Sequence, residues 1–214
     1  MATGVRIRNS SGTIQIDDQY FNYAIIATGQ LTLSLPASGS PYVAASATVR
    51  FAAQSPMIAI QSPNGNAVVG AVTPAGAGLW DVTILGGAVA VTYFVLDQCP
   101  QQGSHGVGMR LRRASDQKIT FDSGFYYPKV VFAGTATKND MAAASYAVIC
   151  AQGGGYMNAG AQPPNNYEYI TAYRTTSTGV IVSNDQPLRA WGAGISMVAV
   201  NARFLMLDVS NVFT

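Results

Sequence analysis

Charged side chains are scarce in this chain. Only 10% of its 214 residues are Asp, Glu, Lys or Arg, whereas soluble proteins contain about 25% on average. Charge is depleted where a surface is buried against a partner, so a surface largely covered by neighbouring subunits explains the scarcity better than poor solubility does. The 12 basic and 10 acidic residues leave a formal net charge of +2, which argues against nucleic-acid binding driven by a basic surface.

Long apolar runs and targeting signals are also missing. The longest apolar run, ILGGAVAVTYFVL at 84–96, is shorter than the roughly 20 residues that a transmembrane helix needs. Asp81 and Asp97 stand just outside it. Residues 1–12 lack the basic-then-apolar pattern of a signal peptide. We therefore expect a buried strand at 84–96, no membrane insertion, and a chain that is made and folded in a cytoplasm.

Cysteine and histidine are nearly absent. Cys99 and Cys150 do not form a CxxC motif, and a cytoplasmic origin favours free thiols. His105 is the only histidine, whereas a zinc site usually needs several His or Cys ligands and a Ser or Cys triad needs a base beside the nucleophile. The residues therefore predict no metal and no cofactor, and His105 is interpreted as a solvated linker residue.

Two other patterns found in enzymes have simpler explanations here. Asp17-Asp18 and Glu168 supply carboxylates, but nothing local brings two of them to the roughly 5–10 Å separation that glycoside hydrolysis uses. Asp17 recurs as Asp122 in a repeated segment, which indicates that it closes a turn through local hydrogen bonds. The glycines at 153–155 lack the lysine and the helix start of a phosphate-binding loop. We expect no enzymatic activity.

What the sequence does contain is one hairpin pattern that occurs twice. GVRIRNSSGTIQIDDQYF at 4–21 is matched by GMRLRRASDQKITFDSGF at 108–125. The alternation of apolar and polar residues predicts two antiparallel strands with one apolar and one polar face. In the first copy, a four-residue loop would place Ile7 opposite Ile14. In the second copy, a loop one residue longer would keep the same faces.

Further landmarks follow the two hairpins in the same order. They are FAAQ (51–54) and ICAQ (149–152), Trp80 and Trp191, and VAVTYFVLD (89–97) and VAVNARFLMLD (198–208). Strand-like alternation runs through both halves, and no segment has a 3.6-residue apolar stripe between helix caps. We expect an all-β protein of two tandem, internally duplicated β-sandwich domains, 1–100 and 106–214, with a linker at 101–105. Each domain should have around seven or eight strands.

One segment has the composition of a binding loop. GGGYMNAGAQPPNNYEY at 153–169 is long for a connection between strands. Tyrosine and asparagine supply flat amphipathic area and amide hydrogen bonds, as recognition loops and sugar-contacting surfaces do. A loop that docks on a neighbouring subunit has the same composition. The candidate recognition or subunit-contact residues are Tyr156, Asn158, Asn165, Asn166 and Tyr167.

The repeated hairpin resembles that of a known group of proteins. GVRI at 4–7, a turn at Gly12 and the ending Ile16-Asp17 are similar to the N-terminal hairpin of small tail-associated proteins of tailed bacteriophages and phage-derived tailocins. In that group Gly-Leu/Val-x-Ile/Val and a turn precede an apolar-Asp ending. The motif is short, and many hairpins favour such residues. Members of the group carry a single hairpin, so the duplication leaves the exact tail component open.

The resemblance implies a structural protein of the phage tail tip or tail fibre. Such a protein would assemble in the bacterial host cytoplasm, reside in the virion tail, and bind itself as a homotrimer and other virion tail proteins. A trimer of two-domain chains would present six similar domains and could join a sixfold tail tube to a threefold fibre. Contact with a host surface glycan or receptor is a further implied role of the second domain. The alternatives are a carbohydrate-binding, lectin-like protein, a capsid decoration protein and, third, a glycan depolymerase.

Overall fold

The computed structural model describes the chain in eight segments: residues 6–8, 14–17, 22–36, 44–101, 108–153, 155–158, 166–191 and 202–212. Within these segments the regular structure consists of strands and one 3₁₀ turn, η1 (Ser210–Val212). The expected all-β class is therefore confirmed. The described residues include no helix that is long and apolar enough to cross a membrane.

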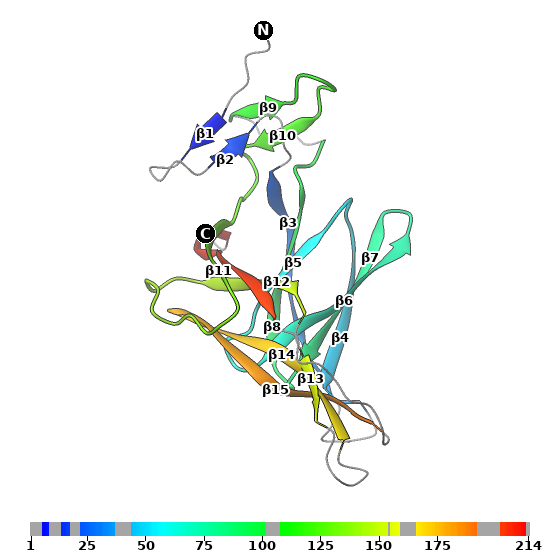
Figure 1. Cartoon of the computed structure of the whole chain (residues 1–214). Coiled ribbons are helices and arrows are strands. Elements are labelled where there is room, and N and C mark those ends of the chain that lie inside the picture. Colours follow the sequence, from blue (N-terminus) through cyan, green and yellow to red (C-terminus); the bar gives the residue numbers. More distant parts are fainter. Residues whose placement is uncertain are drawn as a thin grey trace.

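The first large sheet, called sheet I, has the strand order β11-β16-β12-β5-β8-β3 (Figure 1). Its strands are β3 (Tyr23–Thr32), β5 (Met57–Gln61), β8 (Ala90–Gln98), β11 (Lys129–Gly134), β12 (Tyr146–Gln152) and β16 (Arg203–Asp208). Every neighbouring pair is antiparallel. The central pair joins the two halves of the chain, because Ile60 of β5 faces Val148 of β12.

The second large sheet, called sheet II, also combines strands from both halves. Its strands are β4 (Ala45–Ala52), β6 (Ala67–Gly76), β7 (Leu79–Gly86), β13 (Gly155–Asn158), β14 (Asn166–Thr176) and β15 (Gly179–Trp191). The order is β13-β14-β6-β7-β4, and β15 also pairs with β14. Sheet II is joined at its centre where Ala67 of β6 faces Tyr173 of β14.

The described strands thus form two sheets that both halves share. Each half contributes three strands to each sheet, and the order β3-β8-β5 in the first half corresponds to β11-β16-β12 in the second. This differs from the expected pair of separate sandwiches at 1–100 and 106–214. The physical reason is that the β5–β12 and β6–β14 pairs satisfy strand edges that separate sandwiches would leave open.

One of the expected landmark pairs does not occupy corresponding strands. FAAQ (51–54) begins in β4 of sheet II, whereas ICAQ (149–152) lies in β12 of sheet I. This correspondence is wrong, because similar short motifs fell on strands of different position. Trp80 in β7 and Trp191 at the end of β15 each precede the last described strand of their half, β8 and β16, as expected. The third pair ends on β8 and β16, which both lie between two other strands of sheet I.

Two small hairpins form separate two-stranded sheets at one end of the molecule (Figure 1). β1 (Arg6–Arg8) pairs with β2 (Ile14–Asp17), β9 (Arg110–Arg112) pairs with β10 (Ile119–Asp122), and β2 contacts β10. Their registers match at three positions: Arg6 and Arg110 face Asp17 and Asp122, Ile7 and Leu111 face Ile16 and Phe121, and Arg8 and Arg112 face Ile14 and Ile119. The repeated hairpin is therefore confirmed as a repeated structure.

The expected register within each hairpin is wrong, by two positions at Ile7 and Leu111 and by one position at Arg8, which faces Ile14 and not Thr13. Ile7 faces Ile16 and not Ile14. In the second hairpin Leu111 faces Phe121, whereas the loop length had placed it opposite Ile119. Both hairpins contain a register irregularity at the same place, which adds a residue to one strand and changes the pairing beyond it.

The turn of the second hairpin explains this shift. Arg113 N–H donates to Lys118 O at 2.9 Å, and Gln117 N–H donates to Arg113 O at 2.8 Å. Gln117 has a φ of 59°, the left-handed conformation that an ordinary residue seldom adopts. Asp116 stabilises the turn by accepting a hydrogen bond from Arg113 Nε at 2.9 Å. The loop therefore extends one residue further than the sequence pattern indicates.

Hydrogen bonds attach the second hairpin to sheet I. Asn22, just before β3, donates to Thr120 O from its backbone at 3.0 Å and from its side chain at 2.7 Å. Gln101 accepts from Ile119 N–H at 2.7 Å and donates to Ile119 O at 2.9 Å. Gln101 opens the expected linker at 101–105, so this residue is fixed; residues 102–105 lie outside the described part.

The apolar core is divided between the two faces of sheet I. Alternate residues along a strand point to opposite faces, and Ile58 and Ile60 pack in one core cluster whereas Ala59 packs in another. The clusters shared with sheet II contain Val82, Ile84 and Val95 in the first half and Tyr173, Phe204 and Met206 in the second. The opposite face buries Ile25, Phe94, Leu96, Ile149 and Leu207. Sheet I is thus buried on both sides.

Candidate functional site

The expected binding loop at 153–169 is in large part a pair of strands. Tyr156 and Asn158 lie in β13, and Asn166 and Tyr167 lie in β14. Asn158 faces Tyr167 across the hairpin. Asn165 lies outside the described residues. The interpretation of 153–169 as one long loop is therefore wrong, because Gly155–Asn158 pairs with the start of β14 and leaves a shorter connection.

The other residues considered for chemistry do not come together in the part of the chain that is described. Glu168 faces Met157 in β13 and Arg189 in β15. His105 and Asp18 lie outside the described residues. Among the residues that are described, no group of three or more His, Cys, Asp or Glu side chains is placed to hold a metal ion.

Asp97 is a buried carboxylate with structural partners. It is 3% exposed and accepts hydrogen bonds from the backbone N–H groups of Gln54 at 2.6 Å, Ser55 at 2.9 Å and Gln98 at 2.8 Å. A carboxylate that accepts several N–H groups holds a loop in one conformation. Asp97 therefore fixes the connection between β4 and β5 to the end of β8.

A second polar cluster lies at the base of the repeated hairpin. The Tyr127 hydroxyl accepts a hydrogen bond from Asp122 N–H at 2.9 Å and donates to Cys99 Sγ at 3.4 Å. Burial raises the pKa of Cys99 and the pKa of Tyr127 above their ordinary values. Both groups stay protonated at neutral pH, and their hydrogen bonds join the segment after β8 to the base of the second hairpin.

Cys150 occupies a related environment in the second half. It is a free thiol, as is Cys99, in agreement with the expectation from the sequence. The Tyr173 hydroxyl lies 3.9 Å from Cys150 Sγ, and burial raises the pKa of the thiol. Cys150 differs from Cys99 in being only partly buried, because it lies beside an open cleft.

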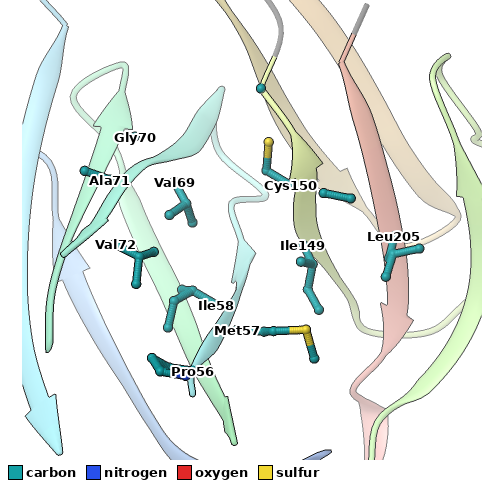
Figure 2. A pocket seen from close by; sticks show the side chains of 12 residues that line it. Pro56, Met57, Ile58, Val69, Gly70, Ala71, Val72, Ile149, Cys150 and Leu205 are labelled. Carbon is teal, nitrogen blue, oxygen red and sulfur yellow. The ribbon is translucent and has the colours of Figure 1, made fainter. Parts of the chain in front are cut away.

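This cleft is a feature of the described surface that the sequence did not predict. β5 and β12 pair only where Ile60 faces Val148 and Ala59 faces Ile149, and the strands separate beyond these positions (Figure 2). The space that opens there has a volume of about 580 Å³. Its lining residues are Pro56, Met57, Ile58, Val69, Gly70, Ala71, Val72, Ile149, Cys150, Ala151, Gly153 and Leu205.

The cleft is apolar and crosses from one half of the chain to the other. Figure 2 shows Val69 and Val72 of β6 on one side, Ile58 and Met57 of β5 in the middle, and Leu205 of β16 on the other side. None of the described residues that line it is Asp, Glu, Lys, Arg or His. An ionic substrate would lose its hydration there without gaining a partner. The chemistry of the site therefore suits apolar side chains.

A strand edge without a partner among the described residues borders the same cleft. β6 is joined to β14 only at Ala67 and Tyr173, because β13 pairs with β14 from Gly155 to Asn158 on the next stretch. From Gly70 to Gly76, the described backbone partners of β6 lie only in β7. Free backbone N–H and C=O groups beside apolar side chains form the kind of surface to which an extended strand adds. Comparison of the chain with protein-family models, curated protein sequences and solved structures finds no match.

Proposed function

We propose that this chain is a structural protein of a bacteriophage or tailocin tail, located at the tail tip or tail fibre and assembled as a homotrimer. The observation that carries the proposal is the repeated hairpin, whose two copies have the same register and the same irregularity. Each copy contains the motif that resembles tail-associated proteins. A hairpin retained twice with its Arg–Asp position intact is consistent with a repeated attachment element.

The composition of the surface supports a role in assembly. The exposed large apolar residues among those described are Leu35, Val72, Met109, Tyr126 and Val130. They lie on different elements, and the apolar cleft adds a further uncharged area. Surfaces that stay in contact with neighbouring subunits combine low charge with exposed apolar residues. This combination suits a virion component better than a freely diffusing monomer.

The strand order also supports an internal duplication. The orders β3-β8-β5 and β11-β16-β12 correspond about the central β5–β12 pair, and each half begins with its own hairpin. We interpret the halves as two copies of one unit that have merged their sheets. A homotrimer would then present six related units around a threefold axis, which suits a junction between a sixfold tube and a threefold fibre.

Carbohydrate binding is the second candidate function. The observation that favours it is the β13–β14 hairpin, in which Asn158 faces Tyr167 and Tyr156 faces Tyr169. Amide and phenol groups at neighbouring positions can bind a sugar through hydrogen bonds and ring stacking. This role is compatible with a tail protein that contacts the host surface.

Immunogold electron microscopy of purified particles tests the location. Particles from a host that carries the gene should bind an antibody against the chain at the tail tip or fibre. Label on the capsid would instead identify a decoration protein, and particles without label would contradict the virion proposal. A glycan array with the purified chain and with a Tyr167→Ala, Asn158→Ala variant tests the second candidate: specific binding that the variant loses would support it.

A further inference from the structure

The outer edge of β6 has the properties of a self-association surface. From Gly70 to Gly76 this strand has described backbone partners on one side only, in β7. Gly70, Ala71 and Val72 line the apolar cleft, and Val72 is 36% exposed. The β6–β7 hairpin also extends away from sheet I (Figure 1), so another molecule can reach this edge.

The chemistry of the cleft selects a polypeptide strand as its occupant. Apolar side chains from β5, β12 and β16 form the floor, and the edge of β6 that has no described backbone partner forms one wall. A hydrocarbon ligand would fill the floor but would leave the backbone groups of that edge without partners. An added strand satisfies both, because its backbone pairs with β6 while alternate side chains enter the cleft.

The lack of charge on β6 favours a second copy of the chain as the partner. In a contact about a twofold axis, each residue near the axis lies close to its own copy in the partner, so any charge would face a like charge. β6 from Ala67 to Gly76 contains no charged residue, whereas the adjacent β7 and the next strand, β4, carry the Arg50–Asp81 ion pair. Two β6 strands can therefore lie side by side without repulsion.

We propose that two copies of the chain associate through antiparallel pairing of their β6 strands, so that each β6 fills the cleft of the other copy. Pro74 has no backbone N–H, which places the centre of the ladder before it, near Val72. The contact adds to the threefold assembly proposed above without depending on it. If the threefold assembly forms, the β6 contact would join two trimers into a hexamer. If it does not form, the same contact would join two chains into a dimer.

A charge swap at Val72 tests this contact. Val72→Lys and Val72→Glu each place two like charges near the twofold axis, so each variant alone should lose the β6 contact at concentrations where the unaltered chain retains it. An equimolar mixture should recover it, because Lys then faces Glu. Light scattering measures the mass of each sample against the 22.4 kDa chain. Since Val72 is partly exposed, the substitutions leave the core in place, and circular dichroism checks that both variants fold.

A matched control places the same substitution on β11, the edge strand of sheet I. Val130 on β11 is 56% exposed, lies at the outer edge of sheet I and is not among the described residues that line the cleft. Val130→Lys should leave the β6 contact intact, so any change of mass that it causes would report on the threefold contacts and not on β6. A cysteine at the axis gives a second readout: Val72→Cys in a Cys150→Ser background should form a disulfide-linked dimer on mild oxidation, and Val130→Cys should not.

The results decide the contact and the proposed function separately. An even-numbered assembly that both single variants disrupt and the mixture restores would support the β6 contact. A trimer whose mass does not respond to either charge would overturn the β6 contact and leave the tail proposal intact. A chain that is monomeric without any substitution would overturn both the β6 contact and the homotrimer.

Discussion

Arg110 and Asp122 form an ion pair across β9 and β10, with Arg110 Nε and Asp122 Oδ2 2.7 Å apart. Asp122 is 4% exposed, and its other carboxylate oxygen accepts the Gly124 N–H at 2.9 Å. The same position recurs in the first hairpin, where Arg6 faces Asp17. Asp122 thus closes a turn through a local hydrogen bond, the role that the sequence predicts for its counterpart Asp17, whose side chain lies outside the described part; the Arg110–Asp122 pair also stabilises the hairpin.

Replacing Asp122 with Asn should destabilise the protein. Removing one partner of a buried pair costs about 3–5 kcal/mol, but the Arg110 side chain is 33% exposed and can be partly hydrated. We therefore expect the free energy of unfolding to fall by about 2 kcal/mol, measured by urea denaturation. Asp116→Asn removes the partner of Arg113 in an exposed pair and serves as the control. Equal losses in both variants would contradict this account of Asp122.

Asp116 should titrate at unusually low pH. Hydrogen bonds from Arg113 lower its pKa from 3.8 to about 2. Because the folded pKa is below the ordinary value, the resulting stability is complete above about pH 4 and is lost as the pH falls towards 2. Carboxyl chemical shifts measured by NMR should give this low midpoint. Arg113→Gln should raise it, and a midpoint that stays low in this variant would assign the shift to another group.

The two thiols should differ in reactivity. Burial raises the pKa of both, so both remain largely protonated at pH 8 and react slowly. Cys150 is partly exposed beside the cleft, whereas Cys99 is 0% exposed. A thiol reagent should modify one cysteine per folded chain, identified as Cys150 by mass spectrometry, and two after unfolding. Modification of Cys99 first would contradict the placement of β8.

Gly179 should not tolerate a side chain. Its φ is 147°, and an added Cβ would overlap Lys138 O, where the segment before β12 pairs with β15 through Lys138 N–H and Val180 O at 2.8 Å. We expect Gly179→Ala to lower the free energy of unfolding by about 1–3 kcal/mol, measured by thermal denaturation. At Gly153 an added Cβ meets nothing within 4 Å, so Gly153→Ala should change little.

The strand content and the repeated hairpin were predictable because they depend on local alternation. The register was not, because it depends on a left-handed residue, Gln117, and on a turn that extends to Lys118. A sequence pattern fixes which residues share a face, but a register irregularity changes the pairing without changing the pattern.

The shared sheets and the cleft could not be predicted from the sequence, for a different reason. The contacts of Ile60 with Val148 and of Ala67 with Tyr173 join segments about a hundred residues apart in the chain, and nothing local specifies them. The cleft exists because these pairings are short and the strands then separate. The only local signal was the uncharged run of β6, which reads equally well as a buried strand.

The mass of the purified chain in solution, measured by multi-angle light scattering, tests most directly whether this is a self-assembling virion protein. The account predicts a closed assembly of three or six chains of 22.4 kDa that persists on dilution. A stable, soluble monomer would contradict it, because the low charge and the open apolar cleft would then require no neighbouring copy.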